Sequence, residues 1–242
     1  MKLRTNRLVS LITLGMLVAM SAYSLARDKT HSAVTPAPRD GNWMKRHESF
    51  NERVKKGNVD LLLIGDSITQ GWEGSGKNVW TKFYTPRNAV NLGIGGDRTQ
   101  HVLWRLDHGN VEGISPKAAV LMIGTNNSSD NTPEEIADGV EAIVEKLRAK
   151  LPQTKVLVLA IFPRGANPED KRRQVNTQAN ELIAKLADGE SVHFLDIGSK
   201  FLGEDGSLSK EIMPDLLHLS EKGYTIWAES IEAKVKELMG ET

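Results

Sequence analysis

Short apolar runs alternate with longer amphipathic segments from residue 59 to the end of the chain. Each run is apolar at nearly every position, which is typical of a strand that is buried on both faces of a parallel sheet. The predicted strands are 59–64, 89–92, 118–123, 155–161 and 192–196.

The segments between these runs have apolar residues at helical spacing. The helix after Thr132 has the clearest start, with Thr132 as the cap, Pro133 at the first position and Glu135 at the third. Its predicted apolar face is Ile136, Val140, Ile143, Val144 and Leu147. Further helices are predicted over 43–54, 79–84, 99–106, 170–186 and 220–239, the last capped by Ser220. Strands that alternate with such helices predict one α/β domain of three layers, α/β/α, around a parallel sheet.

Residues 1–26 have the three parts of a secretory signal peptide. A basic start is followed by an apolar stretch over 8–20, and small residues lead to Ala26, after which we expect cleavage. An uncleaved membrane anchor is the alternative, because the apolar stretch approaches the minimum length that spans a bilayer. If the signal is cleaved, we expect a periplasmic or secreted protein with no stable membrane insertion.

A polar stretch follows the predicted signal. Residues 27–42 contain Pro36 and Pro38 and show no periodicity, so they predict a flexible linker before a domain at 43–242.

Composition limits the chemistry. The chain has 31 basic and 31 acidic residues, and removing residues 1–26 leaves 28 basic against 31 acidic, so nothing favours nucleic acid as a partner. The chain has no cysteine, which excludes disulfides, a cysteine nucleophile and a cysteine-bound metal. No cluster has the spacing of metal ligands, and we expect no metal and no other cofactor.

The first predicted strand runs into Gly65-Asp66-Ser67. Ligands of open α/β sheets bind outside the carboxyl ends of the strands, so Ser67 is a candidate nucleophile. The alternative is that these three residues only make a turn.

Asp215 and His218 follow the fifth predicted strand. A spacing of three residues in a tight turn allows the carboxylate to accept from Nδ1, which leaves Nε2 free to take a proton from a serine. A helix-start turn with a solvated histidine is the alternative.

Acyl transfer also needs donors for the developing oxyanion. Gly96 can offer its backbone N–H, and Asn126 can offer its side-chain amide. The alternatives are a helix-entry glycine and a turn residue.

Four ordered blocks together resemble the SGNH (GDSL) hydrolases, over about residues 59–239. The blocks are Gly65-Asp66-Ser67, Gly96, Gly124-x-Asn126 and Asp215-x-x-His218. Within that family, several stretches are similar to the branch of the platelet-activating-factor acetylhydrolase catalytic subunits. They are 91–106, 124–127, 163–165 and 218–220.

The resemblance implies a flavodoxin-like, five-stranded parallel sheet of order 2-1-3-4-5 and metal-free ester hydrolysis. It implies that Ser67 is the nucleophile, His218 the base and then the acid, and Asp215 the residue that orients it. The Ser67 N–H, the Gly96 N–H and Asn126 would hold the oxyanion.

The side chains beside these blocks predict the acyl specificity. Ile68, Thr125 and Leu217 flank the site and can close a pocket for a short acyl group, acetyl first. Arg164 and, by sequence position, Trp72, Arg98 and Trp104 are candidates for contacts with the alcohol half. The alternative for these four is that they are core aromatics and solvated arginines.

We therefore predict an exported serine esterase that acts through an acyl-enzyme on short-chain esters of carbohydrates or lipids. Two alternatives stay open: an O-acyltransferase with the same serine chemistry, and a catalytically idle glycan- or lipid-binding domain. A homodimer is a further possibility, because dimers are common in the family branch that the sequence resembles.

Overall fold

A computed structural model describes residues 30–241 of the chain. The predicted signal peptide lies outside the described residues. Five parallel strands form one sheet in the order β2-β1-β3-β4-β5, which confirms the predicted α/β class and strand order. The strands are β1 (Leu61–Gly65), β2 (Ala89–Gly93), β3 (Ala118–Met122), β4 (Lys155–Leu159) and β5 (Val192–Leu195).

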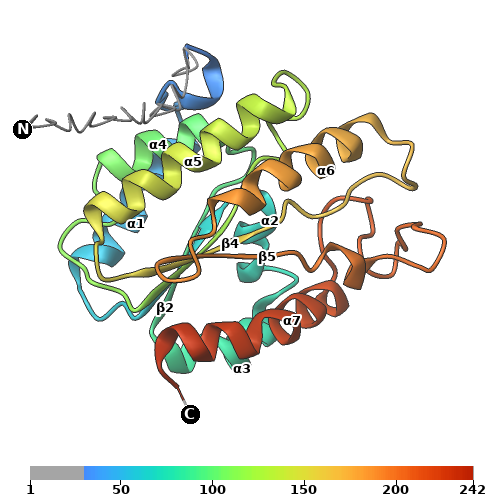
Figure 1. The fold of residues 1–242 in the computed structure, drawn as a ribbon. Helices are drawn as coiled ribbons and strands as arrows, with labels where there is room; N and C mark the ends of the chain where they lie inside the picture. The colour runs from blue at the N-terminus through green and yellow to red at the C-terminus, as the bar shows by residue number, and fades with distance from the viewer. Residues whose placement is uncertain (1–29, 242) are drawn as a thin grey trace, which may run out of the picture.

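Helices cover both faces of this sheet (Figure 1). One face carries α1 (Asn42–Lys55), α4 (Thr99–Asp107), α5 (Pro133–Lys150) and α6 (Lys171–Ile183). The other face carries α3 (Lys77–Phe83) and α7 (Glu221–Met239), which lie side by side, together with the short α2 (Ser67–Gln70). Short 3-10 helices complete the chain: Ser32–Val34, Gly71–Glu73, Thr85–Arg87, Ala184–Leu186 and Gly198–Phe201.

Successive side chains of the strands enter opposite halves of the core. In β1, Leu62 and Ile64 pack with the layer of α1, α4 and α5, whereas Leu61 and Leu63 pack with α3 and α7. All five residues of β1 are buried, because helices cover both of its faces. This central strand therefore delivers Ser67, two residues beyond its end, from a rigid support.

The predicted capping box sets the start of α5. The Thr132 hydroxyl accepts from the N–H of Glu135 at 3.3 Å, and a Glu135 carboxylate oxygen accepts from the N–H of Thr132 at 3.2 Å. These two bonds satisfy N–H groups that have no partner within the helix.

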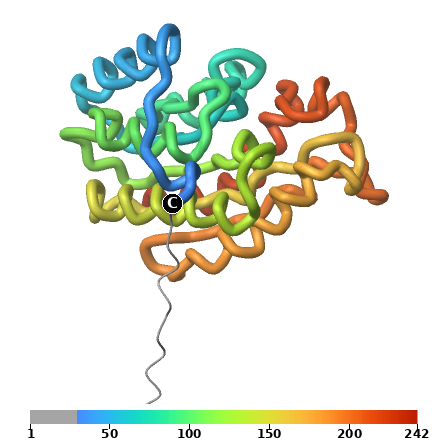
Figure 2. The backbone as a smooth tube through the Cα atoms, turned by 90° about the horizontal axis from the view of Figure 1, so that it is seen from above, coloured from blue at the N-terminus to red at the C-terminus, as the bar shows by residue number. Residues whose placement is uncertain are grey.

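The prediction of a flexible linker is wrong for residues 30–42, which pack against the domain. In Figure 2 this segment, in blue, runs back over α4 and α5. Ala33 is fully buried, and its carbonyl accepts from the Thr99 hydroxyl at 2.7 Å. Gly139 of α5 permits the approach, since a Cβ there would lie 2.8 Å from the Ala33 carbonyl oxygen. Backbone atoms such as the Ala33 carbonyl and the Ala37 N–H make much of the contact between this segment and α4. The polar side chains of the segment therefore do not indicate that it packs against the domain.

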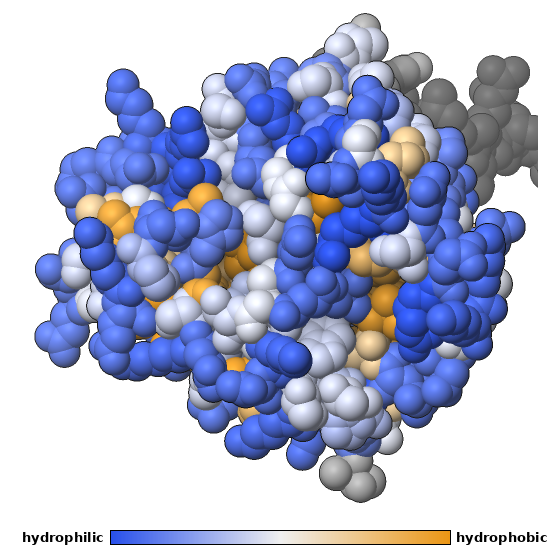
Figure 3. Space-filling view, turned by 180° about the vertical axis from the view of Figure 1, so that it is seen from behind, coloured by the Kyte–Doolittle hydropathy of each residue, from blue (hydrophilic) through white to orange (hydrophobic). Residues whose placement is uncertain are grey.

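The face of the molecule opposite to the view of Figure 1 is mostly polar. Figure 3 shows hydrophilic side chains over most of one face, with hydrophobic atoms largely recessed between them. Within residues 30–241, no helix combines the length and the apolar character that a membrane span requires.

Candidate active site

Ser67 is the first residue of α2, directly after β1. The Asp66 carboxylate caps this helix by accepting from the N–H of Ile68 at 2.9 Å. At the other end of the turn, the Tyr224 hydroxyl of α7 donates to the Ile68 carbonyl at 2.6 Å. Strand, cap and tyrosine together fix the backbone that carries the serine hydroxyl.

Ser67, His218 and Asp215 form one hydrogen-bonded chain. His218 Nε2 lies 2.9 Å from Ser67 Oγ, and His218 Nδ1 lies 2.6 Å from Asp215 Oδ2. With the proton on Nδ1 directed to the carboxylate, Nε2 can accept the serine proton. The structure thus brings Ser67 next to Asp215 and His218, although His218 lies 151 positions further along the chain.

Hydrogen bonds from backbone N–H groups to the Asp215 carboxylate stabilise the turn from Asp215 to His218. Asp215 Oδ1 accepts from the N–H groups of Leu217 at 3.1 Å and His218 at 2.7 Å. Leu216 has φ 61°, a left-handed conformation that is rare for leucine, and its carbonyl accepts from the Gly165 N–H at 2.9 Å. Partial burial alone would raise the pKa of Asp215, but the bonds from His218 and Leu217 hold it below its usual range. Asp215 therefore stays ionised as the partner of His218.

The second carboxyl, on Asp66 beside Ser67, has a different environment. Asp66 is fully buried, and burial raises its pKa to about 7 against the opposing effect of the Ile68 N–H. Its Oδ2 has no hydrogen-bond partner among the described residues. Asp66 thus acts as a structural cap of α2.

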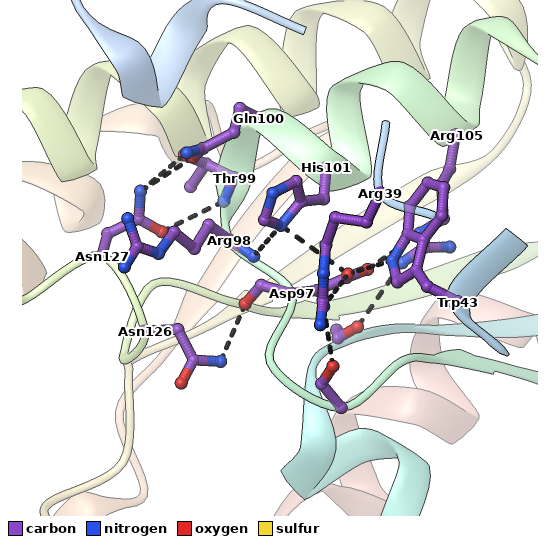
Figure 4. A network of polar contacts seen from close by, with 12 residues as sticks. Arg39, Trp43, Asp97, Arg98, Thr99, Gln100, His101, Arg105, Asn126 and Asn127 are labelled. Carbon is purple, nitrogen blue, oxygen red and sulfur yellow. Dashed lines mark hydrogen bonds and ion pairs between the residues drawn. The ribbon is translucent and has the colours of Figure 1, made fainter. Parts of the chain in front are cut away.

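Of the three predicted oxyanion donors, Asn126 lies on a loop next to that of Asp97, the residue that directly follows Gly96 in the chain (Figure 4). Gly96 has φ 75°, a conformation that favours glycine. Asn126 Nδ2 donates to the Asp97 carbonyl at 2.8 Å, which uses one of its two amide hydrogens and leaves the other for a ligand. The N–H groups of Ser67 and Gly96 have no acceptor within residues 30–241.

The four residues predicted to line the substrate pocket, three on the acyl side and Arg164 on the alcohol side, differ in exposure. Ile68 and Thr125 are only 1% and 2% exposed, so they belong to the floor beneath the site. Leu217 and Arg164 are half-buried. Arg164 Nη1 lies 3.2 Å from the Thr125 hydroxyl, so the guanidinium is held next to the residue that precedes Asn126.

The aromatic candidates for substrate contact are structural. Trp72 is 1% exposed and packs against Tyr224, with ring centroids 4.4 Å apart. Trp104 is partly buried, packs against Trp43, and stacks on His108 with ring centroids 3.7 Å apart. Arg98 forms an ion pair with Asp130.

The sequence analysis missed a buried polar network behind the Gly96 loop. Asp97 is fully buried and accepts from Trp43 Nε1 at 2.6 Å and Arg105 Nε at 2.9 Å. Arg39 Nη1 donates to the Gly95 carbonyl at 2.9 Å and lies 3.4 Å from Asp97 Oδ1. No local motif marks these partners, because they come from three separate segments of the chain.

Together, the three-layer α/β fold and the serine, histidine and carboxylate at the carboxyl edge of its sheet define the class of serine-type hydrolases. Residues 63–226 match the model of the GDSL-like Lipase/Acylhydrolase family. The chain belongs to this family, and its enzyme class is ester hydrolysis.

Curated relatives agree with this assignment. The chain is 40% identical over 204 residues to platelet-activating factor acetylhydrolase IB subunit alpha2 of Rattus norvegicus, covering 84% of this chain and 87% of that protein. It is also 40% identical over 203 residues to subunit alpha1 of Homo sapiens, covering 84% and 86%.

Solved structures share the fold at lower identity. A GDSL-like lipase of Bacteroides thetaiotaomicron superposes with a TM-score of 0.64 at 20% identity, over 80% of this chain and 97% of that one. A carbohydrate acetylesterase family member of Sinorhizobium meliloti gives a TM-score of 0.58 at 17% identity, over 75% and 99%.

Proposed function

We propose that this enzyme hydrolyses short-chain esters, acetyl esters first, through an acyl-enzyme on Ser67. The observation that carries the proposal is the continuous chain from Ser67 Oγ through His218 to Asp215, with separations of 2.9 and 2.6 Å. Such a chain supplies the nucleophile, the base and the residue that orients the base.

The reaction proceeds in two halves. Ser67 Oγ attacks the ester carbonyl carbon while His218 Nε2 takes the hydroxyl proton, and the oxyanion of the tetrahedral intermediate is held by the N–H groups of Ser67 and Gly96 and by Asn126. The intermediate collapses, the C–O bond to the alcohol breaks, and His218 returns the proton to the leaving oxygen. Water activated by His218 then hydrolyses the acyl-serine and regenerates the free hydroxyl.

Preference for a short acyl group is supported by the floor of the site. Ile68 and Thr125 are almost completely buried, and the hydrogen bonds of Arg164 to Thr125 hold that side firmly. A long acyl chain would have to displace packed core atoms, which costs free energy. The names of the relatives are consistent with this, since one group is described as acetylhydrolases and a solved neighbour as a carbohydrate acetylesterase.

We further propose that the enzyme is exported and acts on acetylated carbohydrates or lipids. Export rests on the basic, apolar and small-residue pattern of residues 1–26. Determining where the protein is found and its N-terminal residue tests it: we expect Arg27 outside the cytoplasm. A protein found only in the cytoplasm would contradict export, and an exported chain that keeps Met1 would indicate the uncleaved anchor.

The test of the proposed function is hydrolysis of p-nitrophenyl acetate, butyrate and octanoate. We expect acetate to be turned over fastest, and Ser67→Ala to lose the activity by about 10⁴-fold or more. Ser49→Ala is the matched control, because Ser49 is an exposed serine whose hydroxyl bonds only the carbonyl of Arg46 in its own helix.

Each outcome decides one part of the proposal. An active Ser67→Ala variant would overturn the nucleophile. Faster hydrolysis of octanoate than of acetate would overturn the short-acyl preference alone. Acylation of an added sugar in place of water would favour the O-acyltransferase, and no activity on any ester would favour a binding domain.

A further inference from the structure

The backbone on both sides of Gly96 is tied down by long-range side-chain contacts. On one side, the Gly95 N–H donates to Gln70 Oε1 at 2.7 Å, and the Gly95 carbonyl accepts from Arg39 Nη1 at 2.9 Å. On the other side, the Asp97 carbonyl accepts from Asn126 at 2.8 Å. The direction of the Gly96 N–H is therefore set by contacts outside its own loop.

The Asp97 side chain anchors this loop from within the protein (Figure 4). It is fully buried, and burial raises its pKa against the opposing effect of Arg105, which is also fully buried. Trp43 Nε1 provides the shortest bond to this carboxylate, at 2.6 Å. A buried carboxylate with three cationic or N–H partners has one favoured position, and the loop backbone is attached to it.

Arg39 lies directly against Gly96. A Cβ at Gly96 would lie 3.2 Å from Arg39 Nη1 and 3.4 Å from Nη2, so the guanidinium packs on the glycine itself. The Arg39 side chain is 38% exposed, so it sits at the boundary between this buried network and solvent.

We propose that Arg39 and Trp43 are positioning residues for the oxyanion hole. The segment 30–42 and the start of α1 thus complete the active site from outside the four blocks that mark the family in the sequence. They act through Gly95 and Asp97, which flank Gly96, and the Asp97 carbonyl also accepts from Asn126. This inference rests on the proposed role of Gly96 and Asn126 as oxyanion donors.

The expected effect follows from how strongly acyl transfer depends on donor placement. Removal of one oxyanion donor costs about 10²–10³-fold in kcat, and a displacement of about 1 Å can cost about 10²-fold. Arg39→Gln and Trp43→Phe keep the Gly96 N–H and the Asn126 amide but fix their positions less firmly. We therefore expect kcat to fall by about 10-fold or more in each variant, with KM changed by less than about 3-fold. Trp43→Phe keeps an aromatic ring in the core, and it removes the Nε1–H that donates to Asp97 together with part of the indole ring.

Arg46→Gln is the matched control. Arg46 is another arginine of the N-terminal region that ties this region to the end of β2, since its Nε donates to the Gly93 carbonyl at 2.8 Å. It also pairs with Glu73 at 2.8 Å, but among the described residues no hydrogen bond or ion pair joins it to residues 95–97. We expect Arg46→Gln to change thermal stability as much as Arg39→Gln does and to leave kcat at the wild-type value.

Two readouts separate positioning from stability. A trifluoromethyl ketone forms a tetrahedral oxyanion on the serine, so we expect Arg39→Gln to weaken its binding by the same factor as it lowers kcat/KM, with inhibition by the product acetate unchanged. Added guanidinium ion at millimolar concentration should restore part of the activity of Arg39→Ala, and Arg39→Lys should lie between Arg39→Gln and the wild type.

Two results would contradict the proposed role of Arg39 and Trp43. Wild-type kcat in both Arg39→Gln and Trp43→Phe, or an equal loss in Arg46→Gln, would overturn this inference while Ser67→Ala remained inactive. Full activity in Ser67→Ala would instead overturn the proposed function on which the inference rests.

Discussion

The two sides of the active site are built in opposite ways. On the base side, His218 and Asp215 have side chains that are 44% and 56% exposed, and their hydrogen bonds mostly join residues within three positions. On the oxyanion side, Asp97 and Arg105 are fully buried, and Asp97 binds Trp43 from 54 positions away. One side is a local turn at the surface, and the other is a long-range network in the interior.

This difference fits the role proposed for each side. A base must exchange protons with substrate and water, so exposure suits it. Oxyanion donors work by being fixed in place before the charge develops, and buried hydrogen-bonded partners give that rigidity. We therefore expect substitutions on the base side to affect chemistry and those on the oxyanion side to affect chemistry and folding together.

The largest expected effect is on the base side. His218→Ala removes the group that moves the proton, so kcat for p-nitrophenyl acetate should fall by about 10⁴-fold or more. Because the side chain is half-exposed, the free energy of unfolding in urea should change by less than about 1 kcal/mol. A large loss of stability in this variant would contradict the description of the base side as a local turn at the surface.

Next in size is a stability effect on the oxyanion side. Arg105→Met leaves the buried Asp97 carboxylate without the bond at 2.9 Å and also removes the bond to Asn110 at 2.7 Å. We expect urea unfolding to show a loss of about 3–5 kcal/mol. Adding Asp97→Asn should recover part of that loss, because the uncompensated charge is then gone. A loss below 1 kcal/mol in the single variant would contradict the network.

A smaller chemical effect should come from the orienting carboxylate. Asp215→Asn should lower kcat by about 10²-fold, less than the roughly 10⁴-fold known for a buried triad acid, because water already solvates this exposed pair. The control is Asp107→Asn, another aspartate in a surface ion pair, with Lys146, which should keep full activity. A loss of 10⁴-fold would mean that the turn closes over the base when substrate binds.

The smallest expected effect is a pH dependence of the free energy of unfolding, caused by the buried His47 near Arg105. Burial, with Arg105 and His108 nearby, lowers the pKa of His47 to about 4 from the 6.5 of the unfolded chain. Between these values only the unfolded chain binds the proton, so stability is lost as pH falls from 6.5 towards 4. Between pH 7 and pH 5, the free energy of unfolding should fall by about 2 kcal/mol less in His47→Gln than in the wild type. Urea unfolding at the two pH values measures this difference. An unchanged pH slope would count against a neutral, buried His47.

The same contrast explains what the sequence could predict. Asp215-x-x-His218 and Gly65-Asp66-Ser67 are local motifs at the ends of apolar strands, and the fold requires those ends to meet at one edge. Thr132 and Glu135 likewise specify their helix start within four residues. Such features could be predicted because each motif and its structural setting lie close together in the chain.

The supporting network could not be predicted in that way. Arg39 lies in a polar, proline-containing stretch, and its acceptor on Gly95 is 56 positions away. Trp72 and Trp104 were expected near the cleft because of their positions, but tertiary packing placed them among other rings. Pairing of this kind is decided by which segments become neighbours in space, and a single sequence does not carry that information.

The packed segment at residues 30–42 has a practical consequence for anyone who trims this chain. The hydrophobic pattern suggests residue 43 as a natural place to start a minimal domain, yet the cut would discard Arg39 and the Ala33 carbonyl that Thr99 binds. Such a shortened chain would keep every family motif and the whole sheet. If it proved a poor enzyme, the loss of residues 30–42, rather than the wrong substrate, would be the first cause to examine.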